Sequence, residues 1–246
     1  MSFHLSLIVY ILALLSCAEE EGSNPSNESE MVNPNATKIM PLGASRVEGA
    51  RPIFESYRYE LWKLMIDASW TIDLIGTQSD DANYPPYLGL AFDNDHEGRG
   101  GWTSAQILSG IDEWIALTGS PDVVLLSSPG GNDGLQNLSF AEAVANVNSV
   151  IDVLQQANAD VTIIIEQMAP ARSDEMTEGL SAYFEAMQQE IPKIVDSQTT
   201  ATSQVIAVDM FTGFSDDLLA DDVHYNEQGA KFVADRYFQV LTDIIN

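Results

Sequence analysis

Ser45 is the first residue whose type and position could do chemistry. It follows the apolar run 38–43 (KIMPLG) and lies in a turn flanked by Gly43 and Gly49. A serine on the turn between a strand and a helix can be an exposed nucleophile. A serine in a glycine-rich turn is more often a helix N-cap, so this position alone does not decide between the two roles. A serine nucleophile also needs a base that removes its proton.

The candidate bases are three histidines, His4, His96 and His224. His4 lies in the apolar N-terminal run, which leaves the other two. His224 belongs to the motif DDVHYNEQG, which begins at Asp221. An Asp three residues before a His, across a turn, can accept the Nδ1 hydrogen and leave Nε2 facing a serine. The motif is also compatible with a capping turn in which Asn226 starts the last helix. We predict His224 as the base and the first Asp of the motif as its partner.

Two further positions could stabilise negative charge on a carbonyl oxygen that a serine attacks. Asn132 lies in the motif PGGNDG, and its amide can donate a hydrogen bond without the desolvation cost of a charge. Gly101 precedes a predicted helix, where backbone N–H groups lack a partner within the helix. An ordinary Gly-Asn turn is the alternative for the first motif.

The loop before Gly101 contains the acidic segment 93–97 (DNDHE). Its side chains could in principle hold calcium, but their spacing is not that of an EF-hand. An acidic turn is the favoured interpretation. We therefore expect neither a metal nor an organic cofactor.

Short apolar runs separated by amphipathic stretches indicate how these residues are positioned. The predicted strands, rich in Val and Ile, are 38–43, 71–76, 122–128, 161–168 and 204–210. The predicted helices are 53–68, 103–117, 140–157, 178–195 and about 226–245. This alternation predicts an α/β fold, a three-layer α/β/α sandwich with a five-stranded parallel sheet. Because ligands bind beyond the carboxyl ends of such strands, the Ser, Gly, Asn and Asp-x-x-His positions should meet at one edge.

The N-terminal segment is predicted to direct export. Residues 1–16 are almost wholly apolar, too short for the roughly 20 residues of a membrane span, and typical of a secretory signal. They end in Leu-Leu-Ser-Cys17, which resembles the bacterial lipobox; Cys17 is the only cysteine, so no internal disulfide is possible. Residues 17–37 are acidic and rich in Ser and Asn, as disordered tethers are. We predict a signal peptide (1–16), a lipidated tether (17–37) and one domain (38–246) in a periplasmic or cell-surface lipoprotein of a bacterium. A cleaved signal without a lipid and a misassigned start are the alternatives.

The charge of the chain excludes several partners. The formal net charge is −27, from 10 Lys and Arg against 37 Asp and Glu. Such a surface repels nucleic acid and anionic lipid headgroups. We therefore expect no nucleic-acid partner, membrane contact only through a lipid at Cys17, and a monomer.

Six blocks of the sequence resemble the SGNH/GDSL hydrolases, and most closely the acetylxylan esterases of carbohydrate esterase family 3. The blocks are KIMPLGASRVEG from Lys38, Tyr57-Arg58, Ile72–Gly76, DHEGRGGW from Asp95, GGND from Gly130 and DDVHYNEQG from Asp221. The resemblance covers about 38–245. It implies a flavodoxin-like sandwich with strand order 2-1-3-4-5.

The resemblance also implies a role for each site residue. Ser45 matches the nucleophile, His224 the base and Asp221 its orienting acid. The backbone N–H of Ser45, the backbone N–H of Gly101 and the side chain of Asn132 match the oxyanion hole.

The chain departs from the family pattern at Ala44, where the family has an Asp before the serine. The resemblance implies that this carboxylate braces the turn with hydrogen bonds. With alanine those bonds are absent, and a buried donor left unpaired costs about 1–3 kcal/mol. We predict that Ala44→Asp raises or preserves the rate of ester hydrolysis, measured as initial rates on p-nitrophenyl acetate. A large loss would show that this turn is built differently.

These observations predict a serine esterase that hydrolyses acetyl esters through an acyl-enzyme, on polysaccharide such as acetylxylan. Trp102 and Arg99 are the predicted substrate contacts, and Tyr84 offers a second stacking face for sugar rings. A lipase, lysophospholipase or thioesterase on the same fold is one alternative, and it would need an apolar tunnel for the acyl chain. A catalytically weakened glycan-binding lipoprotein is another, although retention of all the site residues argues against it.

Overall fold

The computed structural model describes residues 33–80 and 82–245. The predicted signal segment, Cys17 and most of the predicted tether lie outside the described residues. Among the described helices, none combines the length and the apolar character needed to cross a bilayer.

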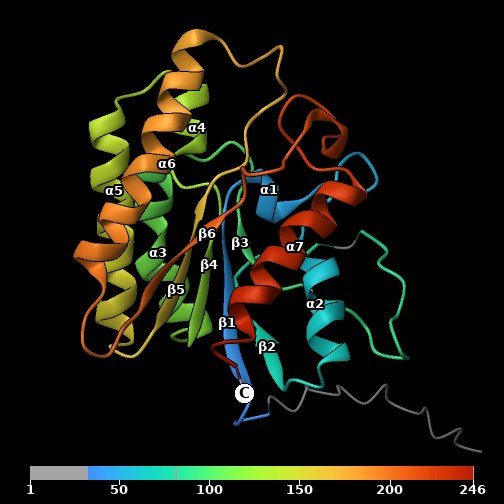
Figure 1. Ribbon diagram of the computed structural model, residues 1–246. Coiled ribbons are helices and arrows are strands. Elements are labelled where there is room, and N and C mark those ends of the chain that lie inside the picture. The colour runs from blue at the N-terminus through green and yellow to red at the C-terminus, as the bar shows by residue number, and fades with distance from the viewer. Residues whose placement is uncertain (1–32, 81, 246) are drawn as a thin grey trace, which may run out of the picture. The chain divides into compact units, whose positions relative to one another are not determined.

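A parallel sheet forms the centre of the domain (Figure 1). Its strands are β1 (Thr37–Gly43), β2 (Ile72–Leu74), β3 (Glu97–Gly98), β4 (Val123–Leu126), β5 (Thr162–Gln167) and β6 (Val205–Asp209). The strand order is β2-β1-β4-β5-β6, and the two-residue β3 pairs with the end of β1. The five predicted strands and their implied order are confirmed. Strand β3 was not predicted, because a Glu-Gly pair gives no apolar run.

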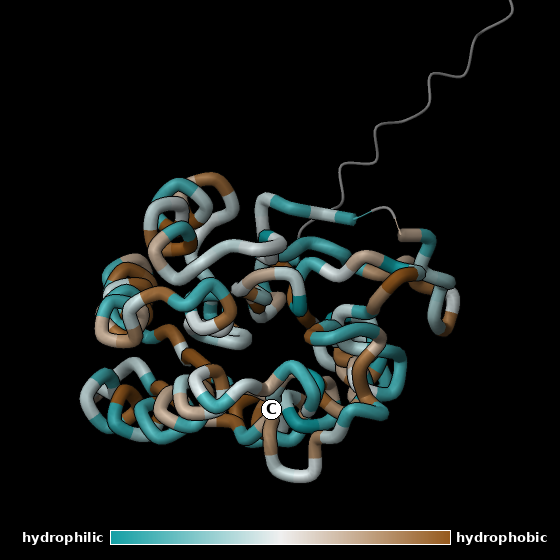
Figure 2. Tube along the Cα trace, turned by 90° about the horizontal axis from the view of Figure 1, so that it is seen from above, coloured by the Kyte–Doolittle hydropathy of each residue, from teal (hydrophilic) through white to brown (hydrophobic). Residues whose placement is uncertain are grey.

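Helices cover both faces of the sheet, as predicted. They are α1 (Ser45–Glu48), α2 (Arg58–Asp67), α3 (Ser104–Thr118), α4 (Gly131–Leu135), α5 (Phe140–Ala157), α6 (Glu178–Gln198) and α7 (Glu227–Leu241), with a short 3-10 helix η1 (Asp216–Leu218). Helices α3, α5 and α6 lie on one face and α2 and α7 on the other (Figure 1). Seen from above, hydrophilic and hydrophobic residues alternate along the helical turns, as in amphipathic helices packed on a sheet (Figure 2).

The core consists of two apolar clusters, one on each side of the sheet. Successive strand residues point to opposite faces. In β1, Met40 and Leu42 join the cluster under α3, α5 and α6, whereas Ile39 joins the cluster under α2 and α7. All three are fully buried. This two-sided burial holds the carboxyl end of β1 in place, where the chain turns into Ser45.

The largest difference between a predicted and an observed helix boundary is at the start of α2. The apolar spacing predicted a helix from residue 53, but α2 begins at Arg58. Residues 50–57 instead form a turn in which Ala50 bridges Phe54 and Glu55 bridges Tyr225. Tertiary contacts with the His224 segment therefore override the helical spacing of this stretch.

Candidate active site

Ser45 begins the four-residue helix α1 directly after β1. Gly43 makes the turn possible, because a Cβ there would lie 2.8 Å from Cγ2 of Val47 and 3.0 Å from the backbone oxygen of Ser127. The β1 strand can therefore turn sharply against β4 only with glycine at this position. The turn leaves Ser45 half-buried rather than enclosed.

A chain of hydrogen bonds connects Ser45, His224 and Asp221. Nε2 of His224 lies 2.9 Å from Oγ of Ser45, and Nδ1 lies 2.7 Å from Oδ2 of Asp221. Asp221 also accepts hydrogen bonds from the backbone N–H groups of Val223 and His224, at 2.9 and 2.8 Å. Asp222 points elsewhere: its side chain is 67% exposed and lies 3.8 Å from Arg172. The structure thus selects Asp221 over its neighbour as the partner of His224.

The surroundings of Asp221 keep its carboxylate charged. Partial burial acts to raise its pKa, but the hydrogen bonds from Val223 and His224 outweigh it and hold the pKa below the ordinary value. A charged carboxylate on Nδ1 fixes the tautomer in which Nε2 can accept the serine proton, and it stabilises the imidazolium that results.

Phe54 packs on the imidazole ring of His224. The two ring centroids are 3.8 Å apart and the planes are inclined by 11°. The backbone N–H of Glu55 donates to the backbone oxygen of Tyr225 at 2.8 Å, which holds this turn beside the histidine segment. The imidazole is therefore fixed by Asp221 at its edge and by Phe54 on its face.

The three predicted oxyanion donors, Ser45, Gly101 and Asn132, have N–H groups available for hydrogen bonding. The backbone N–H groups of Ser45 and Gly101 have no acceptor among the described residues. Asn132 donates one hydrogen of its side-chain amide to the backbone oxygen of Trp102 at 2.8 Å, which leaves the second amide hydrogen available. This bond also joins the Asn132 turn to the loop that carries Gly101. The role of these three neutral donors in stabilising an oxyanion stays a prediction.

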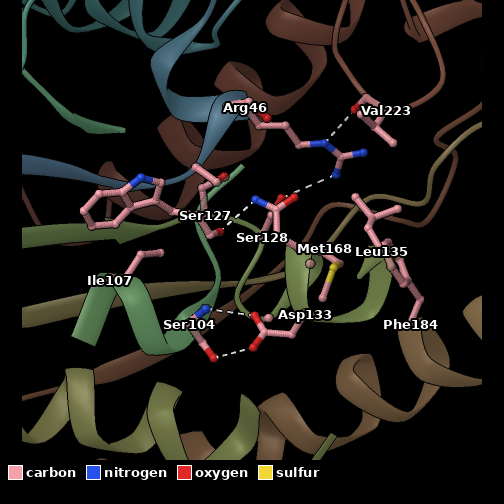
Figure 3. Close-up of a pocket in the computed structure, with 16 residues that line it drawn as sticks. Arg46, Ser104, Ile107, Ser127, Ser128, Asp133, Leu135, Met168, Phe184 and Val223 are labelled. Atoms are coloured by element: carbon pink, nitrogen blue, oxygen red, sulfur yellow. Dashed lines mark hydrogen bonds between the residues drawn. The ribbon is translucent and has the colours of Figure 1, made fainter. Parts of the chain in front are cut away.

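Ser45 and Asn132 line a small pocket of about 40 Å³ (Figure 3). Its apolar wall comes from side chains of α3, α4, α6 and the adjoining loops: Trp102, Ile107, Leu135, Met168 and Phe184. On this measure a cavity needs about 10–15 Å³ to hold one water molecule, so the enclosed part of the pocket holds about as much as a few waters.

The predicted substrate contacts differ in their location. Trp102 lines the pocket, whereas Arg99 does not. Arg99 makes an ion pair with the buried Glu97, donates to Oγ1 of Thr77 at 2.8 Å, and lies 3.7 Å from the ring centroid of Trp114. These contacts direct its guanidinium into the protein, so its role in substrate binding stays a prediction. Tyr84 packs with other aromatic rings outside the pocket lining.

His96 is unsuited to the role of base. Burial, with smaller contributions from two nearby arginines, lowers its pKa to about 2. Its Nδ1 accepts a hydrogen bond from the backbone N–H of Gly98 at 3.0 Å. Among the described residues, no group of three or more His, Cys, Asp or Glu side chains is placed to hold a metal ion. This includes the nearby acidic segment 93–97.

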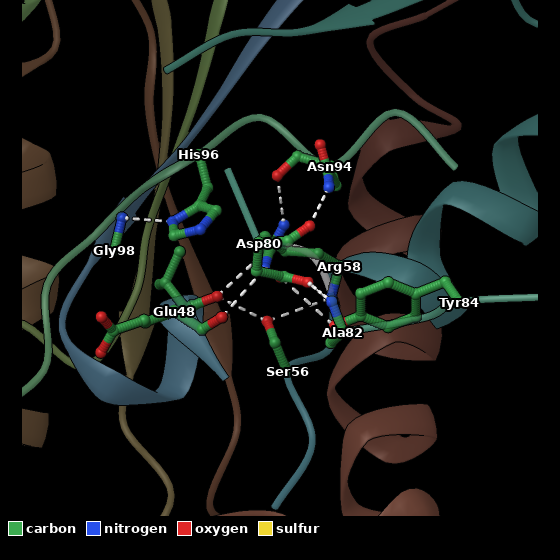
Figure 4. A network of polar contacts seen from close by, with 10 residues as sticks. Glu48, Ser56, Arg58, Asp80, Ala82, Tyr84, Asn94, His96 and Gly98 are labelled. Carbon is green, nitrogen blue, oxygen red and sulfur yellow. Dashed lines mark hydrogen bonds and ion pairs between the residues drawn. The ribbon is translucent and has the colours of Figure 1, made fainter. Parts of the chain in front are cut away.

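A buried arginine holds the far end of α1 (Figure 4). Arg58 donates to the backbone oxygens of Val47 and Glu48 at 2.7 and 2.9 Å and pairs with Asp80. The Oγ of Ser56 also donates to Val47, at 2.7 Å. These bonds satisfy carbonyls that the end of a helix leaves unpaired. They fix a helix too short to be stable alone.

The Glu48 side chain ties α1 to the loop that carries Gly101. Its Oε2 accepts a hydrogen bond from the backbone N–H of Gly100 at 2.7 Å. The approach of the two segments is close, since a Cβ on Gly98 would lie 2.3 Å from the backbone nitrogen of Glu48. The Ser45 turn and the loop that carries Gly101 are thereby held together.

Comparison with known proteins agrees with this geometry. The family model described as GDSL-like lipase/acylhydrolase matches residues 69–232. The chain belongs to this family. The matched range includes Asn132, Asp221 and His224, and Ser45 precedes it. No curated protein sequence matches the chain.

Several solved structures of GDSL-like and related hydrolases resemble the chain over most of its length. A family 3 carbohydrate esterase from Clostridium thermocellum is 31% identical, with a TM-score of 0.68 over 86% of this chain and 100% of that one. A carbohydrate esterase family 3 structure from Talaromyces cellulolyticus is 26% identical, with a TM-score of 0.72 over 85% and 97%. An acetyl esterase mutant with acetate ion is 28% identical, with a TM-score of 0.72 over 85% and 97%. Membership of the GDSL-like family and the similarity to these esterases together show that the protein is a carboxylic ester hydrolase.

Three residues that contact this GDSL-like site received no role from the sequence: Phe54, Glu48 and Arg46. Phe54 was included in a predicted helix face, and the other two fell within a block that resembles the family. Their partners are the His224 ring, the Gly100 backbone and, for Arg46, the backbone oxygen of Val223. Only the folded arrangement shows these contacts, since each partner is distant in sequence.

Proposed function

We propose that the protein hydrolyses acetyl esters, with acetylated carbohydrate as substrate, through a Ser45-linked acyl-enzyme. The observation that carries this proposal is the hydrogen-bonded chain from Ser45 Oγ through both nitrogens of His224 to Asp221, beside a pocket of about 40 Å³. The site residues predicted from sequence keep their predicted roles in this proposal.

The first half of the reaction forms the acyl-enzyme. Nε2 of His224 takes the Ser45 proton as Oγ bonds to the acyl carbon, and the carbonyl oxygen becomes an oxyanion. The Ser45 and Gly101 N–H groups and the Asn132 amide donate to that oxyanion. The tetrahedral intermediate then breaks its bond to the alcohol oxygen, which leaves with the proton from Nε2.

The second half uses water in the same way. His224 removes a proton from water, the resulting hydroxide adds to the acyl carbon, and the Ser45–acyl bond breaks. Ser45 recovers its proton from His224, and the acid is released. Asp221 stays charged throughout, which agrees with its lowered pKa.

The substrate class rests on the pocket and on the similar proteins. The small space of about 40 Å³ beside Trp102, Ile107 and Phe184 supports a short acyl group. The similar structures include two family 3 carbohydrate esterases and an acetyl esterase. Export with a lipid anchor at Cys17, as predicted from the N-terminal sequence, would suit a polymeric substrate outside the cell and is part of the proposal.

We expect acetate release from acetylxylan and from p-nitrophenyl acetate, and a steep fall in activity on longer esters. For p-nitrophenyl octanoate we expect kcat/KM to be at least about 100-fold lower than for the acetate. A long chain in so small a pocket should displace the acyl carbon, and a misplacement of about 1 Å costs about 10²-fold in rate. The measurement is kcat/KM along the series from acetate to octanoate.

The outcomes separate the competing functions. Equal or higher kcat/KM on octanoate would favour a lipase or thioesterase and contradict the acetyl proposal. Binding of xylan without turnover of any ester would indicate a glycan-binding protein and contradict the proposed reaction.

A further inference from the structure

Arg46, the residue after Ser45, is a buried cation whose hydrogen bonds all run to other loops. It is 8% exposed. Its Nε donates to the backbone oxygen of Val223 at 2.8 Å, as Figure 3 shows. Its Nη1 and Nη2 donate to the backbone oxygens of Ala169 and Pro170 at 2.8 and 2.9 Å. The guanidinium carbon also lies 4.8 Å from the ring centroid of Tyr225.

The two residues that Arg46 contacts on the last loop flank His224. Val223 precedes the histidine and Tyr225 follows it. Arg46 itself follows Ser45 in α1. The Arg46 side chain, next to Ser45 in sequence, therefore contacts both residues that flank His224. A shift of either segment must break or bend these contacts.

Arg46 makes no ion pair within 4 Å among the described residues. The nearest acid along its hydrogen bonds is Glu166, reached through the Ser128 hydroxyl at 3.4 Å from Nη1 and 3.2 Å from Oε2 of Glu166. Burying a cation without a directly paired acid is costly, and backbone oxygens compensate only where their directions match the donors. The stability of buried Arg46 therefore depends on the directions of its N–H groups relative to these backbone oxygens.

The planar guanidinium suits these acceptors better than an ammonium group would. Arginine presents five N–H donors in a rigid fork, so one side chain can reach several carbonyls at fixed angles. The start of α1 needs this support, because Ala44 at its N-cap makes no side-chain hydrogen bond.

We propose that Arg46 is a positioning residue that sets the distance between Ser45 Oγ and His224 Nε2 by holding the His224 segment to α1. This inference rests on the proposed function of Ser45 and His224. Arg46 also lines the pocket beside Ser45, but in this role it acts through the backbone around His224.

The test compares Arg46→Gln and Arg46→Lys with the wild-type protein. Kinetics on p-nitrophenyl acetate are normalised to the sites that a fluorophosphonate titrates. For Arg46→Gln we expect kcat to fall about 10–100-fold with KM within about 3-fold, since a misplacement of the order of 1 Å costs about 10²-fold. Arg46→Lys keeps the positive charge but lacks the planar set of guanidinium N–H donors. We therefore expect it to retain less than half of the activity that separates Arg46→Gln from wild type. If Arg46→Gln does not fold, Arg46→Lys provides the kcat and KM comparison.

Arg236→Gln is the matched control. Arg236 also donates to backbone oxygens, those of Asp209 and Thr212, and it is absent from the pocket lining. We expect its kcat to stay within 2-fold of wild type even if its melting temperature falls. A kcat for Arg46→Gln within 3-fold of wild type, or full recovery with lysine, would overturn the inference.

Hydrogen exchange separates this inference from the proposed function. In Arg46→Gln, or in Arg46→Lys if the glutamine variant does not fold, amides in peptides spanning 219–226 should exchange faster than in wild type, with no such change in Arg236→Gln. Unchanged exchange there would contradict the positioning role whatever the activity. If wild type shows no serine-dependent esterase activity while exchange still changes as expected, the proposed function fails and only the structural part of the inference holds.

Discussion

Ser45→Ala is expected to lower kcat for acetyl ester hydrolysis by about 10⁶-fold, the loss seen when the nucleophile of a serine hydrolase is removed. The alanine cannot form the acyl-enzyme, and His224 Nε2 loses the hydroxyl that lies 2.9 Å away. Oxyanion donors and substrate binding would leave only a small residual rate. The measurement is acetate release, together with mass mapping of the residue that a fluorophosphonate labels.

Two comparisons make the Ser45 result specific. The double variant Ser45→Ala/His224→Ala should lose no more activity than Ser45→Ala alone, because residues that act as a unit are not additive. Ser109→Ala removes an exposed hydroxyl on α3 that donates to the backbone oxygen of Gln106, and its kcat should be unchanged. Retention of more than a tenth of the activity by Ser45→Ala, or a label on another residue, would contradict the assignment.

The position of the site could be predicted because a parallel sheet restricts where chemistry occurs. Each buried strand had to be a short apolar run, and the carboxyl ends of such strands share one edge. Ser45, Asn132 and Asp221 each follow such a run, so their order along the chain indicated that they meet. The structure confirms the sheet and brings Ser45, His224 and Asp221 within hydrogen-bond distance.

The residues that hold the site together could not be predicted, because their partners are backbone atoms far along the chain. Arg46 donates to backbone oxygens 123 and 177 positions away. Every residue has a backbone oxygen, so the sequence cannot indicate which of them accepts. Phe54 has the spacing of a helix face, yet the turn at 50–57 presents it to His224. The local hydrophobic pattern predicts helices, strands and their boundaries. The contacts between loops depend on how these helices and strands pack in the folded protein.

Asp221→Asn is expected to lower kcat by about 10⁴-fold, close to the loss when the acid of a Ser-His-Asp triad becomes an amide. An amide at this position can donate to Nδ1, which favours the tautomer whose Nε2 carries a hydrogen and cannot accept the Ser45 proton. It also withdraws the negative charge that stabilises the imidazolium. Asp222→Asn is the matched control, since that side chain is 67% exposed and faces Arg172, and kcat should stay within 2-fold. A larger loss for Asp222→Asn than for Asp221→Asn, in kcat on p-nitrophenyl acetate, would mean that the second aspartate orients His224 during the reaction.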